Sequence, residues 1–126
     1  MKIPNQNLYV LHIRDAVKQI KEYTYEKTYI DLESKPMLRD AVIRQVMIIG
    51  EASKNTPEKL KTEYANIPWK KISGSRDKMT HDYADIELDI IWHIVTKDLP
   101  ELEKAISGYI ETHKDEIAEL ERGVNE

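Results

Sequence analysis

The sequence has no cysteine, only four glycines and no long apolar run, and each of these absences excludes a class of protein. Without cysteine the chain has no disulfide, no thiolate metal site and no cysteine nucleophile. No stretch approaches the ~18–20 uninterrupted apolar residues that a membrane span requires. Residues 1–5 lack the apolar segment of a secretory signal. We therefore expect a cytoplasmic protein that does not bind membranes.

What is present is a polar but globular composition. The 126 residues are 40% hydrophobic and 33% charged, which predicts one domain, residues 1–126, with its own core. The net charge of −4 argues against a general nucleic-acid coat protein. Residues 54–78 nevertheless carry seven basic and three acidic side chains, whereas the last sixteen residues carry two and six. A local basic segment in an acidic protein fits a small phosphate-bearing target.

Apolar residues recur every three or four positions along most of the chain, which predicts an all-α, antiparallel helical bundle. No strand alternation or internal repeat is found. The expected helices are residues 7–29, residues 36–54 with Ser34 as N-cap, and residues 57–64 opened by Thr56-Pro57.

The second half of the chain has a turn and a long apolar stripe. Gly74-Ser75 predicts a turn and an N-cap for a helix over residues 76–83. From Leu88 to Leu120 one apolar stripe persists for more than thirty residues. Asp98-Leu99-Pro100-Glu101 interrupts it with the pattern of a capping box, which predicts two helices with a kink.

The middle of the second helix is apolar on nearly every side, over residues 41–43 and 46–49. Such a helix needs cover all round. In so short a chain a second subunit supplies that cover most simply, so we predict a homodimer.

Arg76, Asp77, His81 and Tyr83 form the densest group of chemically useful side chains. On a helix Asp77 and His81 are neighbours, so the carboxylate can orient the imidazole. Arg76 and His81, five residues apart, diverge by about 140°, and one helix cannot easily aim both at a single atom. Two copies meeting at a two-fold axis could. Spacing alone leaves a structural interpretation equally open, with Arg76 paired to a carboxylate and His81 filling a polar gap.

The remaining candidates are weaker. The sequence has no Walker loop, no G-x-S-x-G and no H-E-x-x-H. Asp89 and His93 lie one turn apart and could share a metal, but no third ligand is in register, so we expect no metal site and no cofactor. His12 and His113 are expected at the surface among charged neighbours.

The segment Gly74–Tyr83 resembles the R-x4-H-x-Y signature of the HEPN superfamily, in the HepT-like branch of minimal nucleotidyltransferase/HepT toxin–antitoxin pairs. Three further blocks resemble that branch, in order and at similar spacing: Ile48-Ile49-Gly50-Glu51-Ala52, Ile67-Pro68-Trp69 and the run from Ile91 to Pro100. The sequence departs from the pattern at Asp77, where Asn is common, and at Ala84-Asp85, where an aromatic–glycine turn is usual.

The resemblance implies a metal-independent endoribonuclease that acts as a toxin. Arg76 and His81 would be the catalytic pair, with Asp77 supporting the imidazole. Imidazole is suited to proton transfer near neutral pH, and guanidinium to stabilising a phosphorane. Lys78, together with Lys70 and Lys71, would steer the RNA backbone.

The resemblance also implies a mode of regulation. A partner nucleotidyltransferase, the antitoxin of a type VII-like system, would transfer AMP from ATP onto Tyr83. The adenylyl group would block RNA access and occupy Arg76. The alternative is a non-catalytic HEPN subunit that binds a nucleotide or the transferase without cleaving RNA.

Overall fold

The computed structural model describes residues 5–74 and 87–125, and within these ranges every regular element is helical. The elements are α1 (Asn7–Thr24), α2 (Tyr29–Ser34), α3 (Pro36–Lys54), α4 (Glu58–Glu63), α6 (Leu88–His93), the π-helix η2 (Ile94–Asp98), α7 (Leu99–Thr112) and α8 (Lys114–Asn125). The prediction of an all-α protein is confirmed.

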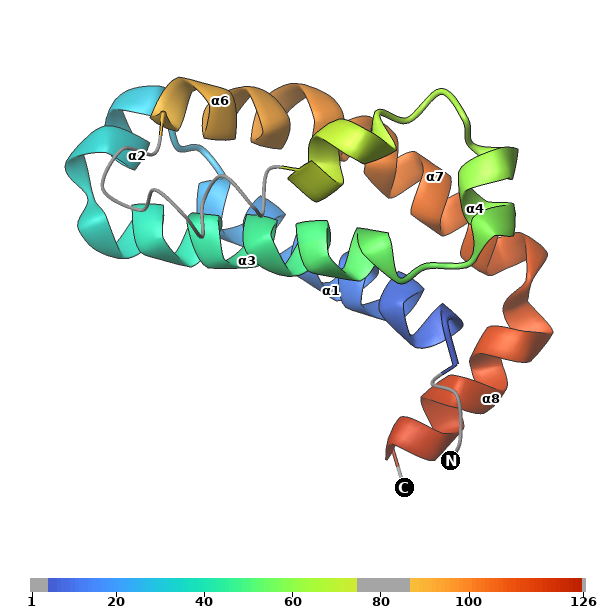
Figure 1. Cartoon of the computed structure of the whole chain (residues 1–126). Helices are drawn as coiled ribbons and strands as arrows, with labels where there is room; N and C mark the ends of the chain where they lie inside the picture. Colours follow the sequence, from blue (N-terminus) through green and yellow to red (C-terminus); the bar gives the residue numbers. More distant parts are fainter. Residues whose placement is uncertain (1–4, 75–86, 126) are drawn as a thin grey trace.

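Two long helices form the base of the fold. Figure 1 shows α1 and α3 packed side by side, with α6, η2 and α7 following one another along the opposite side. The short helix α2 closes one end and contacts both α3 and α6. At the other end α8 turns away from the bundle, near the start of α1.

The predicted apolar stripes form the core. The stripe of α1 is buried at Val10, Ile13, Val17 and Ile20. The stripe that begins in α6 is buried at Ile91, Val95, Leu99, Leu102, Ile106, Tyr109 and Ile117. Only its two ends, Leu88 and Leu120, are partly exposed. The three-and-four spacing therefore identified the inward faces correctly.

The first helix ends earlier than predicted. It stops at Thr24 instead of residue 29, and Glu26 takes the left-handed conformation with φ 56°. A new helix, α2, starts after Thr28, whose hydroxyl accepts a hydrogen bond from the Asp31 N–H while Asp31 accepts one from the Thr28 N–H. These hydrogen bonds, and then Lys35, hold the pKa of the Asp31 carboxyl below its usual range. The capping box therefore starts a new helix at a point where the spacing of apolar residues predicted that the first helix continues.

Two predicted N-caps are wrong. Ser34 lies inside α2, where its hydroxyl donates to the carbonyl of Ile30. Thr56 instead donates to the carbonyl of Ser53 at the end of α3. In both cases the hydroxyl donates to a backbone carbonyl three or four residues earlier, a hydrogen bond that Ser and Thr can make in place of an N-cap. Pro36 does stand in the first turn of α3, as expected.

The apolar middle of α3 is covered largely within this chain. Val42, Ile43, Val46 and Ile49 are buried, and the flanking apolar residues are partly buried. The middle of α3 therefore leaves less apolar surface for a second subunit to cover than the sequence indicated. The homodimer itself stays a prediction.

The segment before the motif is helical, over residues 69–74. Trp69 packs against the core and donates its indole N–H to the carbonyl of Tyr64 at 3.0 Å. Gly74 is helical, and the rest of the turn predicted at Gly74-Ser75 lies outside the described residues. Within the described residues no helix is both long and apolar enough to cross a membrane.

Gly108 in α7 is required by a close approach from Tyr64. A Cβ at residue 108 would lie 2.4 Å from the phenolic oxygen of Tyr64 but 3.4 Å from the ring carbon that carries it. Only the hydroxyl therefore stands in the way of a larger residue.

We predict that the effect of Gly108→Ala on stability changes sign with residue 64. In the natural chain the clash should lower the free energy of unfolding by about 1 kcal/mol. In a Tyr64→Phe background the same change should raise it by about 0.5–1 kcal/mol, because alanine favours helix over glycine. Urea unfolding of the four proteins measures both effects, and destabilisation of equal size in both backgrounds would contradict the prediction.

Candidate functional site

Every catalytic and modification residue proposed from the motif lies outside the described residues. This applies to Arg76, Asp77, Lys78, His81 and Tyr83. Their roles therefore stay predictions, and the structure bears on the site through the residues on either side of residues 75–86.

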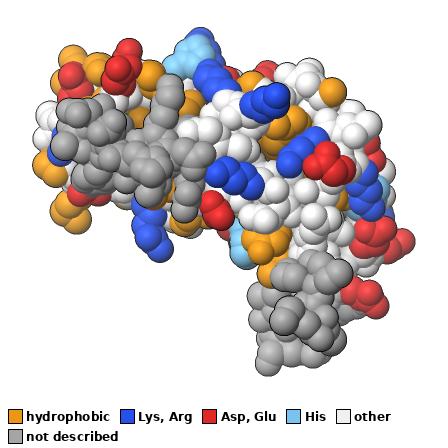
Figure 2. Space-filling model, in the orientation of Figure 1, with side chains coloured by type: hydrophobic (Ala, Val, Ile, Leu, Met, Phe, Trp, Pro, Cys, Tyr) orange, Lys and Arg blue, Asp and Glu red, His pale blue; other side chains and the backbone are white. Residues whose placement is uncertain are grey.

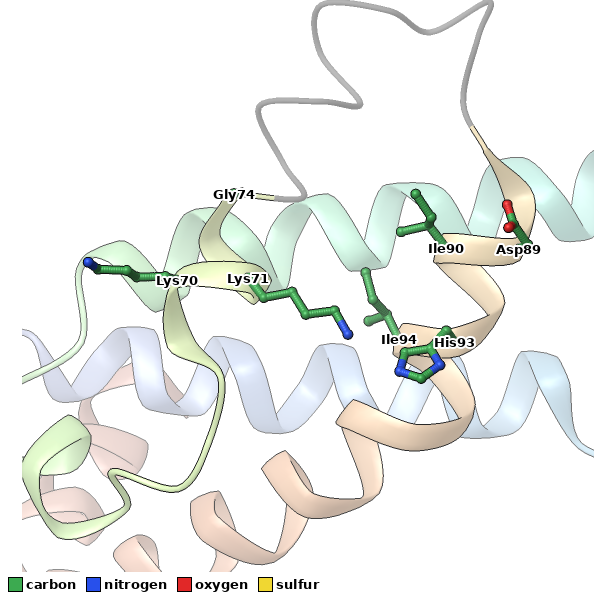
Figure 3. Close-up of a pocket in the computed structure, with 7 residues that line it drawn as sticks. All are labelled: Lys70, Lys71, Gly74, Asp89, Ile90, His93 and Ile94. Carbon is green, nitrogen blue, oxygen red and sulfur yellow. The ribbon is translucent and has the colours of Figure 1, made fainter.

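A pocket of about 620 Å³ lies between the two segments that flank residues 75–86. It is lined by Lys70, Lys71, Gly74, Asp89, Ile90, His93 and Ile94. One wall is the helix over residues 69–74, and the other is α6 with the first residue of η2 (Figure 3). The pocket thus adjoins the last residue described before the motif.

The structure gives different roles to the two lysines expected to steer RNA. Lys71 extends its amine across the pocket toward the wall that carries His93, whereas Lys70 points away (Figure 3). The Lys71 Nζ lies 2.8 Å from Asp98 Oδ2, although the geometry is that of an ion pair and not of a directed hydrogen bond. Lys70 has no ion pair within the described part of the chain. In the space-filling view, several basic side chains stand over the middle of the face (Figure 2).

Asp98 reaches Lys71 because the helix changes type at this point. Asp98 makes no side-chain cap, so the predicted capping box is wrong. Pro100 cannot donate a backbone hydrogen bond, and its ring would clash with the carbonyl four residues earlier in a regular α-helix. The chain passes this point through the wider turn of η2, closed by a bond from the Leu99 N–H to the Ile94 carbonyl. The Asp98 side chain, only 12% exposed, is left free to pair with Lys71.

Asp89 and His93, considered above as a metal pair, both line the pocket instead. Among residues 5–74 and 87–125, no three His, Asp or Glu side chains come together as metal ligands. Burial raises the pKa of the Tyr29 phenol above its usual value, and the carboxylates of Glu33 and Asp89 raise it further. The negative charge of Asp89, at the rim of the pocket, therefore also acts on Tyr29 in α2.

The expectation for the other two histidines holds for one of them. His12 is exposed on α1. His113 is only partly exposed: its side chain is 17% exposed, its ring lies 4.2 Å from that of Tyr109, and its Nε2 is 3.4 Å from Glu63 Oε1. Sequence spacing missed this because His113 stands between α7 and α8, where the chain changes direction.

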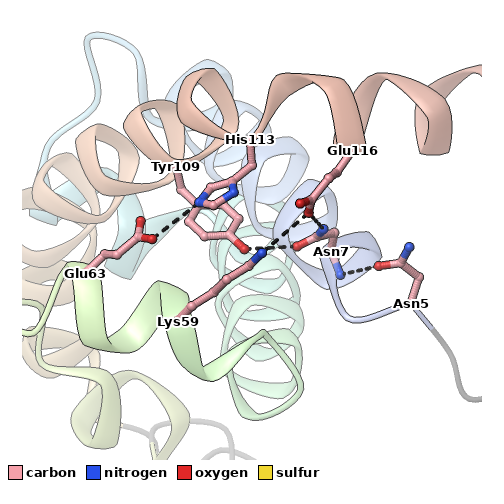
Figure 4. A network of polar contacts seen from close by, with 7 residues as sticks. All are labelled: Asn5, Asn7, Lys59, Glu63, Tyr109, His113 and Glu116. Atoms are coloured by element: carbon pink, nitrogen blue, oxygen red, sulfur yellow. Dashed lines mark hydrogen bonds and ion pairs between the residues drawn. The ribbon is translucent and has the colours of Figure 1, made fainter.

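His113 belongs to a polar network that joins four helices (Figure 4). The Tyr109 hydroxyl donates to Asn7 Oδ1 at 3.2 Å, and Asn7 Nδ2 donates to Glu116 Oε2 at 3.2 Å. Lys59 lies 3.5 Å from the same Glu116 oxygen. Burial, with Glu116 and Glu63 nearby, raises the pKa of Tyr109 to about 12. The network fixes α8 to the bundle far from the pocket and is therefore structural.

Comparison with known proteins places the chain in a family. The family model described as "Ribonuclease HepT-like" matches residues 13–108, which include both walls of the pocket and the motif between them. The chain belongs to the HepT-like ribonuclease family. This confirms the resemblance drawn from the sequence blocks.

Individual relatives carry consistent names. A protein of Methanocaldococcus jannaschii named "Gamma-glutamylcyclotransferase and putative RNase" is 39% identical over 82% of this chain, which spans only 47% of that relative. A "putative RNase" of Caldanaerobacter subterraneus subsp. tengcongensis is 35% identical over 90% of this chain and all of its own length. A "probable ribonuclease HepT" of Thermococcus cleftensis is 37% identical over 75% of this chain and 86% of its own. No solved structure matches the chain closely enough for comparison.

We predict that Lys71 and Asp98 are energetically coupled more strongly than a surface ion pair. Lys71→Met should destabilise the HepT-like chain because the nearly buried Asp98 loses its partner, and Asp98→Asn should then restore part of that loss. A double-mutant cycle by urea unfolding should give a coupling of about 1 kcal/mol. Lys21 and Glu103, 3.0 Å apart but 65% and 38% exposed, serve as the matched pair and should give less than about 0.5 kcal/mol. Equal coupling in the two cycles would contradict the prediction.

Proposed function

We propose that this HepT-like chain is the endoribonuclease toxin of a toxin–antitoxin pair and cleaves RNA without a metal ion. The observation that carries the proposal is the family match over residues 13–108, which contains the R-x4-H-x-Y signature at residues 76–83. The pocket between the segments that flank the signature, with lysines on one wall, supports an RNA substrate.

In the proposed reaction the ribose 2′-hydroxyl attacks the neighbouring phosphate, and the bond to the 5′-oxygen breaks. His81 takes the hydroxyl proton or protonates the leaving oxygen, as imidazole can near neutral pH. Arg76 stabilises the additional negative charge of the phosphorane through its guanidinium. Asp77, one helical turn from His81, would hold the imidazole in position.

The active unit is proposed to be a homodimer. Arg76 and His81 diverge by about 140° on one helix, so a two-fold axis brings an arginine of one subunit to a histidine of the other. Tyr25, Ile30 and Met37, which are 72%, 70% and 88% exposed, give the chain apolar surface to bury against a second copy.

Regulation is proposed to occur at Tyr83. Its phenolic oxygen would attack the α-phosphate of ATP on a partner nucleotidyltransferase, releasing pyrophosphate and leaving AMP on the tyrosine. The phosphodiester charge would then compete with RNA for Arg76.

We expect the purified protein to cleave single-stranded RNA in EDTA, and Arg76→Ala and His81→Ala each to lose activity at unchanged melting temperature. His12→Ala, an exposed histidine on α1, is the matched control and should remain active. Mixed and reassembled Arg76→Ala and His81→Ala subunits should recover about a quarter of natural activity, because half of the dimers regain one of two shared sites. Normal cleavage by either variant would refute the catalytic pair, and no recovery on mixing would refute the shared site.

Adenylylation is tested by co-expression with the neighbouring nucleotidyltransferase gene. The intact mass should increase by one or more AMP units, RNA cleavage should fall, and Tyr83→Phe should prevent both changes. Tyr23→Phe, a partly exposed tyrosine of α1, should leave both unchanged. A mass increase that persists in Tyr83→Phe would place the modification elsewhere.

A further inference from the structure

The pocket beside the motif contains charged groups for which the described part of the chain provides no partner. Lys71 is paired with Asp98. Lys70, Asp89 and His93 also line the pocket, but none of their side chains has a hydrogen bond or ion pair to another described residue. A cavity with several such groups and an apolar lining has the features of a ligand site.

The size and polarity of the pocket limit what it can hold. Its volume of about 620 Å³ falls within the range of small-molecule sites, roughly 300–1,000 Å³. Ile90 and Ile94 supply the apolar part of the wall formed by α6 and η2, and Asp89 stands at the start of α6, away from the lysines (Figure 3). A fitting ligand is anionic at one end, apolar in the middle and a hydrogen-bond donor at the other end.

We propose that this pocket binds one ribonucleotide of the RNA, with its phosphate at Lys71 and His93 and its base against Ile90 and Ile94. Asp89 accepts a hydrogen bond from the exocyclic amino group of the base and so selects cytosine over uracil. The inference rests on the proposed function in taking RNA as the natural source of the nucleotide.

The selectivity follows from the chemistry of a carboxylate. An ionised aspartate only accepts hydrogen bonds. Cytosine and uracil have rings of the same size, but position 4 carries a donating amino group in cytosine and an accepting carbonyl oxygen in uracil. Asp89 therefore attracts the first and repels the second. At the other end, the ammonium of Lys71 keeps donors for a phosphate oxygen while Asp98 holds it toward the pocket.

Binding of CMP and UMP, measured by NMR titration of the isotope-labelled protein, tests the pocket without requiring cleavage. We expect CMP to bind about fivefold more tightly than UMP, the effect of one net hydrogen bond. Asp89→Asn should abolish this preference, since an amide can donate as well as accept, and should strengthen UMP binding. Equal binding of the two nucleotides, no binding of either, or a preference that survives Asp89→Asn would overturn the proposal.

The residues proposed to bind the phosphate of CMP are tested separately from those that bind the base. His93→Gln should weaken CMP binding several-fold while leaving the ratio of CMP to UMP affinity unchanged. Lys97→Gln, an exposed lysine of η2 that does not line the pocket, is the matched control and should bind CMP as the natural protein does. Loss of CMP binding in the control alone would place the phosphate elsewhere and overturn the assignment.

Two further comparisons separate an RNA subsite from a site for free nucleotide. A 2′-O-methylated cytidine tetranucleotide, which cannot be cleaved through its 2′ position, should bind at least tenfold more tightly than CMP if the pocket is one subsite along RNA. Equal affinity would point to free nucleotide and overturn the RNA assignment. Cleavage without CMP selectivity would refute this inference alone, and CMP selectivity without cleavage would refute the proposed function while the nucleotide pocket stands.

Discussion

The second half of the fold depends on how the apolar stripe that begins in α6 passes Pro100. The stripe must stay on the core side from Ile91 to Tyr109, yet the proline cannot take part in regular α-helical hydrogen bonding at this point. The chain resolves the conflict with one π-helical stretch, which keeps Ile94, Val95 and Leu99 buried. Widened turns of this kind are common near functional sites because they redirect side chains without ending the helix.

The same turn connects the core to the pocket. Asp98 would have capped a new helix if the chain had broken at Pro100; in the continuous helix its carboxylate lies beside Lys71 instead. That ion pair joins the helix before the motif to the element that follows it. The two segments entering and leaving residues 75–86 are thus held at a defined separation by groups that belong to neither the motif nor the apolar core.

Features that depend on residues close together in the sequence could be predicted, whereas contacts between distant segments could not. The all-α class and the buried face of each helix follow from the spacing of apolar residues within one helix, and both were predicted correctly. The start of α2 after Thr28 also has a signal in the sequence, a threonine followed three residues later by an acidic residue. The prediction followed the spacing of the apolar residues instead and continued the first helix. The two successive four-residue steps from Ile91 to Leu99 are a signal for the wider turn, since an α-helical stripe normally alternates three and four. The pairing of Lys71 with Asp98 and the stacking of His113 on Tyr109 join distant segments and could not be predicted from spacing.

The candidate site also combines a feature that is local in the sequence with one that requires the fold. The motif was found because its residues are adjacent in sequence, whereas the pocket is assembled from two segments and requires the fold. His93 and Asp89 were considered together as metal ligands because they lie one turn apart on α6, but that spacing places them along one wall of the pocket, opposite the wall that carries Lys71. A site used only to attract phosphate would gain from having no carboxylate at all. An aspartate at its rim weakens the general attraction for RNA and, in return, penalises a base that presents a carbonyl oxygen. An acidic side chain in a pocket that binds a phosphate is therefore better explained by discrimination between substrates than by affinity for them.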